Sequence, residues 1–162
     1  MQKPEVLAPA GSLEKLKIAV DFGADAVYIG GGKLNLRAFS DNFSNDEIIE
    51  GVKYCHDRGR KLYVTMNVFP RNHDLKGAEE YIKGLYDIGV DAIIVADPSI
   101  VSIAQEAAPN LEVHLSTQAN ITNWRATKFW YDQGVKRIVL ARELTFTEIN
   151  NIKKNIPEDC EL

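Results

Sequence analysis

The sequence predicts an α/β fold, specifically an incomplete TIM-type (β/α) barrel with about six of the eight strand–helix units. Short apolar runs alternate with amphipathic helical patterns along all 162 residues. Most of these runs are apolar at consecutive positions, as expected of parallel strands that helices cover. Polar residues follow nearly every run, whereas a doubly wound sheet, which shares the alternation, concentrates its site near one switch point.

Six strands are predicted, and three of them follow a helix-ending glycine, in residues 23–29, 89–95 and 134–140. The predicted strands are residues 6–8, 26–30, 62–67, 92–96, 112–116 and 137–141. A seventh strand should begin within residues 157–162, so residues 1–162 are expected to form one partial barrel domain of a longer protein. A partial barrel leaves a strand edge unpaired, and we expect self-association through that edge.

Helix starts between these strands are marked by residues that can bind free backbone N–H groups. Ser44 with Glu47, and Thr145 with Glu148, fit the capping box. Asp97 precedes a proline at a first helical position and is predicted to cap that helix.

The third helix has its own start signal and an apolar face. Asp74 is predicted to cap it, and one stripe should face the core, formed by Leu75, Ala78, Ile82 and Leu85. Helix ends are predicted where a left-handed backbone is favoured, at glycines 23, 59, 89 and 134.

Composition narrows the class of protein. The net charge of −4 and the pI near 5.4 provide no overall attraction to nucleic acid or anionic lipid, although local basic loops remain possible. The N-terminus lacks the apolar core of a secretory signal, and no stretch reaches membrane-spanning length. Two cysteines, Cys55 and Cys160, fit a reducing compartment, so a cytoplasmic location is expected.

A glycine-rich loop, Gly-Gly-Gly-Lys at residues 30–33, follows the second predicted strand. Val27 and Leu34 stand where a P-loop needs glycine and Ser or Thr, and Asn35 occupies the third glycine position of the dinucleotide fingerprint. The loop is therefore either a plain turn or an anion site, where the backbone approaches the ligand closely and Lys33 and Arg37 supply positive charge.

The segment 111–120 is the one least easily explained by packing. Side chains two apart on a strand share a face, so His114 and Ser116, with Gln118 just beyond, should lie on one surface. Polar groups without partners are costly to bury against the helix layer, so this surface should be the barrel interior. A structural hydrogen-bond network is the alternative. Neither a nucleophile elbow nor a His-Glu-x-x-His metalloprotease signature is present, and no protein-only metal site is predicted.

Polar residues at the ends of other predicted strands complete a candidate site. Asn67 ends the third strand, and Arg142 ends the sixth, where an ion pair with Glu143 is the alternative to substrate binding. Gathered at one rim, these residues would form a mildly basic mouth for an anionic or heterocyclic ligand: Arg37, Asn67, His114, Gln118, Asn120 and Arg142.

Four ordered segments, residues 4–12, 23–30, 35–37 and 114–120, together resemble the N-terminal part of the collagenase-like peptidase family called U-32. The family name implies proteolysis, but the resemblance also implies oxygen-independent hydroxylation of a tRNA uridine with prephenate, of a ribosomal RNA cytidine, or of a ubiquinone precursor. It further implies an iron–sulfur cluster held by cysteines that follow the sixth unit. Neither Cys55 nor Cys160 matches those cysteines.

The resemblance assigns Arg37, His114, Ser116, Gln118 and Asn120 to the pocket. We expect His114 to carry protons, Arg37 to bind a carboxylate or phosphate, and the Gln118 and Asn120 amides to bind a base. The complete protein is then expected to hydroxylate a tRNA uridine, with tRNA as its partner, while the 162-residue segment is not expected to act alone. A collagenase-like peptidase and a non-catalytic partner subunit are the alternatives.

Overall fold

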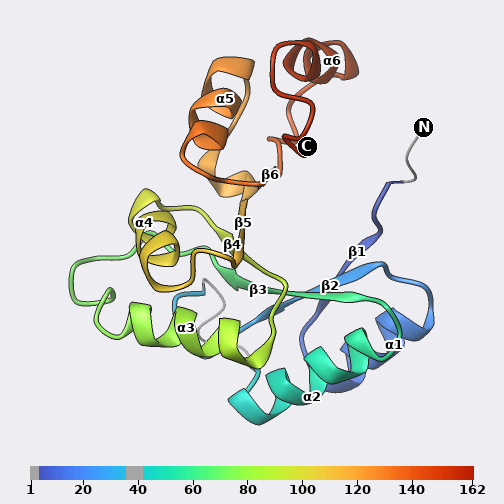
Figure 1. Ribbon diagram of the computed structural model, residues 1–162. Coiled ribbons are helices and arrows are strands. Elements are labelled where there is room, and N and C mark those ends of the chain that lie inside the picture. The colour runs from blue at the N-terminus through green and yellow to red at the C-terminus, as the bar shows by residue number, and fades with distance from the viewer. Residues whose placement is uncertain (1–3, 36–41) are drawn as a thin grey trace.

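The computed structural model describes residues 4–35 and 42–162, which contain a six-stranded parallel sheet that curls into part of a barrel (Figure 1). The strands are β1 (Leu7–Ala10), β2 (Ala26–Gly30), β3 (Lys61–Met66), β4 (Ala92–Val95), β5 (Glu112–Leu115) and β6 (Arg137–Ile138). Each strand pairs in parallel with the next along the chain. This order confirms the barrel and excludes the doubly wound sheet, whose strand order reverses at a switch point.

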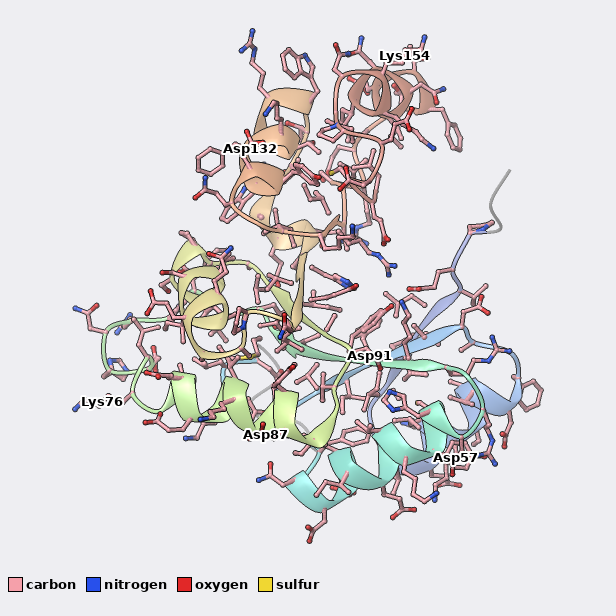
Figure 2. All side chains as sticks on the ribbon, in the orientation of Figure 1. Asp57, Lys76, Asp87, Asp91, Asp132 and Lys154 are labelled. Carbon is pink, nitrogen blue, oxygen red and sulfur yellow. The ribbon has the colours of Figure 1, made fainter. Side chains whose placement is uncertain are left out.

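Helices follow the strands and lie along the outer side of the sheet (Figure 1). They are α1 (Leu13–Asp21), α2 (Asn45–His56), α3 (Ala78–Ile88), α4 (Pro98–Ala107), α5 (Trp124–Asp132) and α6 (Phe146–Lys154), with a short 3₁₀ helix, η1 (Thr117–Ala119). Charged side chains such as Asp87, Asp132 and Lys154 are exposed on their outer faces (Figure 2). Within the two described ranges, no helix has both the length and the apolar character that crossing a bilayer requires.

The predicted helix signals are mostly confirmed. Both capping boxes form, with Ser44 accepting from the Glu47 N–H and Thr145 from the Glu148 N–H, each at 3.3 Å. Asp97 caps α4. The backbone is left-handed at all four predicted helix-ending glycines, including Gly23 and Gly89.

The prediction for Asp74 is wrong. Helix α3 begins at Ala78, after Gly77 in the left-handed region, and has no side-chain cap. Asp74 instead accepts a hydrogen bond from the Arg71 N–H at 2.8 Å, because the chain forms a turn before the helix and uses the carboxylate there. The apolar stripe is confirmed for Ala78, Ile82 and Leu85, which are buried. Leu75 lies in the turn before α3 and packs half-buried against the core.

Strand ends differ from the prediction mainly in β6, which is shorter than the predicted 137–141. The N–H of Ala141 donates to the Ile121 carbonyl in a loop, not to a neighbouring strand. On the other side of β6, Glu161 forms a parallel bridge with Arg137, where the seventh strand was predicted to begin. Self-association, the single-domain boundary and the cytoplasmic location remain predictions.

The sheet separates two apolar regions. The larger core lies between the sheet and the helices, and the smaller one lies inside the barrel around Tyr63 and Ile94. Strand β3 shows the alternation, because Leu62 and Val64 belong to the outer core while Tyr63 belongs to the inner one. Side chains at every second position therefore face the hollow of the barrel.

Candidate functional site

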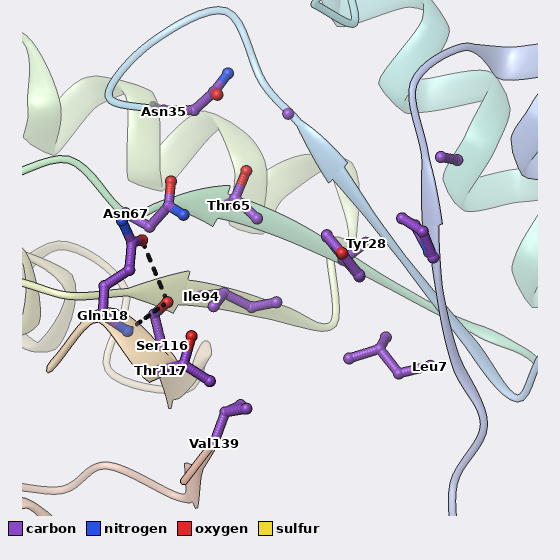
Figure 3. Close-up of a pocket in the computed structure, with 13 residues that line it drawn as sticks. Leu7, Tyr28, Asn35, Thr65, Asn67, Ile94, Ser116, Thr117, Gln118 and Val139 are labelled. Carbon is purple, nitrogen blue, oxygen red and sulfur yellow. Dashed lines mark hydrogen bonds between the residues drawn. The ribbon is translucent and has the colours of Figure 1, made fainter. Parts of the chain in front are cut away.

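A pocket of about 380 Å³ lies inside the barrel, toward the carboxyl ends of the strands (Figure 3). Every strand contributes to it, either directly or through the residues that follow it. Its apolar and backbone wall consists of Leu7, Pro9, Ala10, Tyr28, Gly30, Ile94 and Val139. The position agrees with the rule that barrel enzymes bind substrates at the carboxyl ends of their strands.

The polar part of the pocket consists of hydroxyl and amide side chains. These residues are Asn35, Thr65, Asn67, Ser116, Thr117 and Gln118. None of the described residues that line the pocket is charged. Such a surface suits an uncharged ligand that has an apolar face and several hydrogen-bonding atoms at its edge.

Ser116 and Gln118 occupy the point where β5 passes into η1. The Ser116 N–H still donates to the Val95 carbonyl at 2.7 Å, so Ser116 continues the sheet. Its hydroxyl oxygen accepts the backbone N–H of Gln118 at 3.4 Å and its hydroxyl donates to Gln118 Oε1 at 3.3 Å. Ser116 is 7% exposed. The turn after β5 thus holds the Gln118 amide at the pocket.

The opposite wall comes from β3 and the loop after β2. The Thr65 hydroxyl donates to the Ile29 carbonyl at 3.0 Å. Asn35 Nδ2 donates to both the Gly31 carbonyl and Asn42 Oδ1, each at 2.8 Å, and so fixes the glycine-rich loop. Within the described part of the loop, Lys33 is exposed and does not line the pocket.

Sequence reasoning missed several pocket residues. Thr65 lies two positions before Asn67 and Tyr28 two before Gly30, so both share a strand face with a residue already near the site. Strand periodicity was therefore a signal that could have found them. Asn35 has no such periodicity, although it begins one of the four segments that carry the family resemblance, and its position at the pocket depends on the path of the loop.

The structure brings three of the predicted site residues to this pocket, namely Asn67, Ser116 and Gln118. Asn120 ends η1 with a left-handed backbone, and both it and Arg142 are exposed and do not line the pocket. Arg37 lies outside the described residues. The binding roles predicted for all six remain predictions.

His114 faces the barrel interior, as predicted, but lies nearer the amino ends of the strands than the pocket and does not line it. It is 1% exposed, its Nε2 is 3.3 Å from Glu112 Oε2, and its ring packs edge-on against Tyr63. Burial lowers the pKa of His114 below its ordinary value, and the charge of Arg137 lowers it further, against the opposing effect of Glu112. Its role as a proton carrier remains a prediction.

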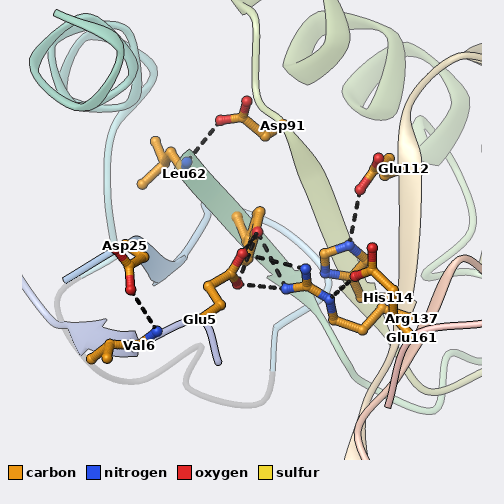
Figure 4. A network of polar contacts seen from close by, with 10 residues as sticks. Glu5, Val6, Asp25, Leu62, Asp91, Glu112, His114, Arg137 and Glu161 are labelled. Atoms are coloured by element: carbon orange, nitrogen blue, oxygen red, sulfur yellow. Dashed lines mark hydrogen bonds and ion pairs between the residues drawn. The ribbon is translucent and has the colours of Figure 1, made fainter. Parts of the chain in front are cut away.

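The surroundings of His114 form a network of polar contacts at the amino ends of the strands (Figure 4). Arg137 binds Glu5 at 2.5 Å and Glu161 at 2.7 Å, and the Tyr63 hydroxyl donates to Glu5 at 3.1 Å. Burial would lower the pKa of Arg137, but its hydrogen bonds to the two carboxylates raise it. A structural network of this kind is the alternative that the sequence left open for His114.

The two cysteines do not fit an iron–sulfur cluster. Cys55 is buried within α2, and burial, with a smaller effect of Asp91, raises the pKa of its thiol to about 11. Cys160 is buried beside β6, and its thiol pKa is also raised by burial. Cluster ligands are thiolates, and residues 4–35 and 42–162 contain no group of three or more His, Cys, Asp or Glu that could hold a metal.

Comparison with known proteins shows what this chain is similar to. The model of Peptidase family U32 matches residues 11–162. The chain is 51% identical to tRNA hydroxylation protein P1 of Bacillus subtilis, over 99% of this chain and 38% of that protein. It is 39% identical to tRNA hydroxylation protein P of Escherichia coli, over 98% of this chain and 35% of that protein. It is 37% identical to a collagenase of Porphyromonas gingivalis, over 96% of this chain and 37% of that protein. The chain thus spans little more than a third of these relatives.

Solved structures support the fold. The U32 peptidase Mk0906 superimposes with a TM-score of 0.74 over 97% of this chain and 68% of that one, at 17% identity. The 3-hexulose-6-phosphate synthase of Salmonella typhimurium gives a TM-score of 0.68 over 93% and 71%, at 15% identity. At these identities the likeness concerns the fold alone.

Proposed function

This chain belongs to peptidase family U32, and from that premise we propose that it forms the substrate pocket of a protein that hydroxylates a uridine in tRNA. The names of its relatives in Bacillus subtilis and Escherichia coli support tRNA hydroxylation, and the choice of a uridine follows from the family resemblance. The whole protein carries the activity in this proposal, and the described segment supplies the surface that receives the base.

The uncharged polar pocket is the observation that carries the proposal. Enzymes that modify a base receive it extruded from its stack, and they recognise its edge with hydrogen-bonding side chains and its faces with apolar ones. Hydrogen-bonding groups for the edge of the base are the amides and hydroxyls of Asn67, Gln118, Thr65 and Ser116. Apolar surface for its faces comes from Tyr28 and Ile94. The volume of about 380 Å³ lies in the usual range for small-molecule sites, about 300 to 1,000 Å³.

Hydroxylation of a base needs an oxygen donor and an acceptor for two electrons. Prephenate as co-substrate and an iron–sulfur cluster belong to the proposal for the complete protein, on the strength of the family resemblance. Because the cysteines of this segment do not fit the cluster, we assign no reaction step to it here.

The peptidase alternative is supported by names in the family, including the collagenase and an uncharacterized protease of Methanocaldococcus jannaschii, which is 44% identical. The pocket gives it less support. The Ser116 hydroxyl donates to Gln118, and the His114 ring binds Glu112, so these two residues do not form a nucleophile–base pair.

Nucleoside mass spectrometry tests the proposal. Deleting the gene for the complete protein should abolish 5-hydroxyuridine and its derivatives in tRNA, and returning the full-length gene should restore them. Unchanged levels in the deletion strain would rule the proposal out.

Two further experiments test the alternatives. Gelatin cleavage by the purified full-length protein, with and without a chelator, tests the peptidase alternative. A full-length protein that shows no iron-dependent colour when it is prepared anaerobically would favour the non-catalytic partner subunit.

A further inference from the structure

We infer that Gln118, held by Ser116, makes the pocket select a base with a carbonyl oxygen at its edge, as in uracil, over one with an amino group there, as in cytosine. The inference rests on the proposed function and adds to it the residue that chooses between two bases of the same size and shape.

The hydrogen bonds of Ser116 determine how the Gln118 amide is turned. The Ser116 oxygen already accepts the backbone N–H of Gln118, and the hydroxyl has a single proton to donate. That proton goes to Gln118 Oε1 at 3.3 Å. With the amide turned over, its NH₂ group would face the hydroxyl, and the proton would lose its acceptor. Because Ser116 is 93% buried, water does not readily replace that acceptor.

The amide therefore offers a donor to the pocket. Its Oε1 faces Ser116 and accepts the hydroxyl proton with one of its two lone pairs, while no residue in the described part of the chain accepts a hydrogen bond from its Nε2. Gln118 lines the pocket, and its side chain lies beside Ser116 in Figure 3. A carbonyl oxygen of a bound base complements this NH₂ group, whereas an amino group would place donor against donor and leave both unpaired.

Thr65 supplies the complementary group on another strand. Its hydroxyl proton is used on the Ile29 carbonyl, so its oxygen can act only as an acceptor toward a ligand. Uracil has an N–H beside its carbonyl groups, whereas cytosine has an unprotonated nitrogen at the same position. One donor from Gln118 and one acceptor from Thr65 thus match the carbonyl and the N–H of uracil, whereas cytosine would present an amino group to the donor and an unprotonated nitrogen to the acceptor.

Binding of two RNA hairpins to the full-length protein tests the inference. The hairpins differ only in one loop base, uridine or cytidine, and affinities are measured by fluorescence anisotropy. Wild type should prefer the uridine hairpin about tenfold. Gln118→Glu, which has the same shape but only acceptors, should remove or reverse this preference. Ser116→Ala should reduce it to about twofold, because the amide can then turn over.

A matched control separates base choice from added charge. Asn72→Asp places the same new charge on the exposed loop after β3, outside the pocket lining, and should weaken both hairpins equally. If Gln118→Glu does not fold, as judged by its melting temperature, Ser116→Ala carries the test. Equal binding of both hairpins by wild type, or an unchanged preference in the folded variants, overturns the inference and leaves the proposed function standing. Unchanged tRNA in the deletion strain overturns both.

Discussion

The Arg137 guanidinium binds the Glu5 carboxylate, 132 residues earlier in the chain, with 2.5 Å between Nη1 and Oε1. Arg137 begins β6 and Glu5 precedes β1, so this ion pair connects the two ends of the six-stranded sheet across the barrel interior (Figure 4). The same guanidinium binds Glu161. Below the candidate pocket, the curvature of the sheet is therefore supported by charge as well as by apolar packing.

Replacing Arg137 should destabilise the fold strongly. Arg137→Met leaves the carboxylates of Glu5 and Glu161 without their cation in a partly buried site, so the free energy of unfolding should fall by about 2 to 4 kcal/mol. Urea denaturation followed by circular dichroism measures it. Lys128→Met, which breaks an exposed pair with Asp132 within α5, should cost about 0.5 kcal/mol or less. An equal loss in the free energy of unfolding for the two variants would contradict a stabilising role of the ion pairs of Arg137.

The contribution of Glu5 should depend on pH. Burial alone would raise the pKa of Glu5, but hydrogen bonds and charge from Arg137 outweigh it, and the pKa lies below its ordinary value. A carboxylate whose pKa is lowered by folding stabilises the protein above its unfolded pKa, about 4.3, and loses that contribution as the pH falls through the folded pKa. The stability difference between wild type and Glu5→Gln should therefore be full at neutral pH and shrink in acid.

Denaturant unfolding of both proteins from neutral pH down to about pH 3 checks this dependence. A difference that stayed constant over that range would mean that ionisation of Glu5 does not contribute.

Asp91 should stabilise the start of a neighbouring strand. Its Oδ2 accepts the Leu62 N–H at 2.8 Å. Asp25, which like Asp91 stands two positions after a helix-ending glycine, accepts the Val6 N–H at 3.0 Å in the same way. Asp91→Ala should lower the free energy of unfolding by about 1 to 2 kcal/mol, and Asp91→Asn, which keeps an acceptor, by less. Asp87→Ala on the exposed face of α3 is the control and should change it little. Thermal unfolding of the variants measures these losses, and an equal loss of stability in Asp87→Ala and Asp91→Ala would count against this role.

The glycine-rich loop should tolerate a methyl group at Gly32 but not at Gly31. A Cβ at Gly31 would overlap the Tyr81 hydroxyl and lie 3.0 Å from Val64 Cγ1, whereas a Cβ at Gly32 would meet nothing within 4 Å. Gly31→Ala should therefore cost about 1 to 3 kcal/mol and Gly32→Ala much less.

The Tyr81 hydroxyl gives a second test of the same contact. It is buried, and no hydrogen bond of normal geometry reaches it from the described residues. The backbone N–H groups of Gly32 and Lys33 still lie near enough to oppose the rise that burial causes in its pKa. These contacts are weak, so Tyr81→Phe should cost little by itself. Combined with Gly31→Ala, it should recover part of the lost stability, because the overlapping atom is gone. If the changes in melting temperature of the two single variants add up to that of the double variant, the two residues are not in contact.

The capping box of α6 gives a matched pair of Thr→Ala changes. Thr145→Ala removes the acceptor for the Glu148 N–H and should cost about 1 kcal/mol. Thr147→Ala, on the exposed surface of the same helix, should be neutral or slightly stabilising, since alanine favours the helix. Urea denaturation of both variants distinguishes a cap from general sensitivity of α6.

Much of the fold was predictable because its signals are local. The capping residues Ser44 and Thr145 bind backbone groups three positions away, and the apolar runs need only their own sequence to be recognised as covered strands. Asp74 shows where local reasoning failed, because a turn before α3 used the carboxylate first. The path of the glycine-rich loop, and with it the role of Asn35, depends on contacts with Asn42 that no local pattern indicates.

The face of β5 shows the division between sequence and structure. Alternation along the strand determined, from sequence alone, that His114 and Ser116 share one face, and their polar character predicted that this face is the barrel interior. Their depth was decided by the tertiary structure, which places Ser116 at the pocket and His114 beneath it against Tyr63. The physical reason is that a strand's periodicity sets the direction of a side chain, whereas its surroundings come from remote segments, here β3 and Arg137 of β6.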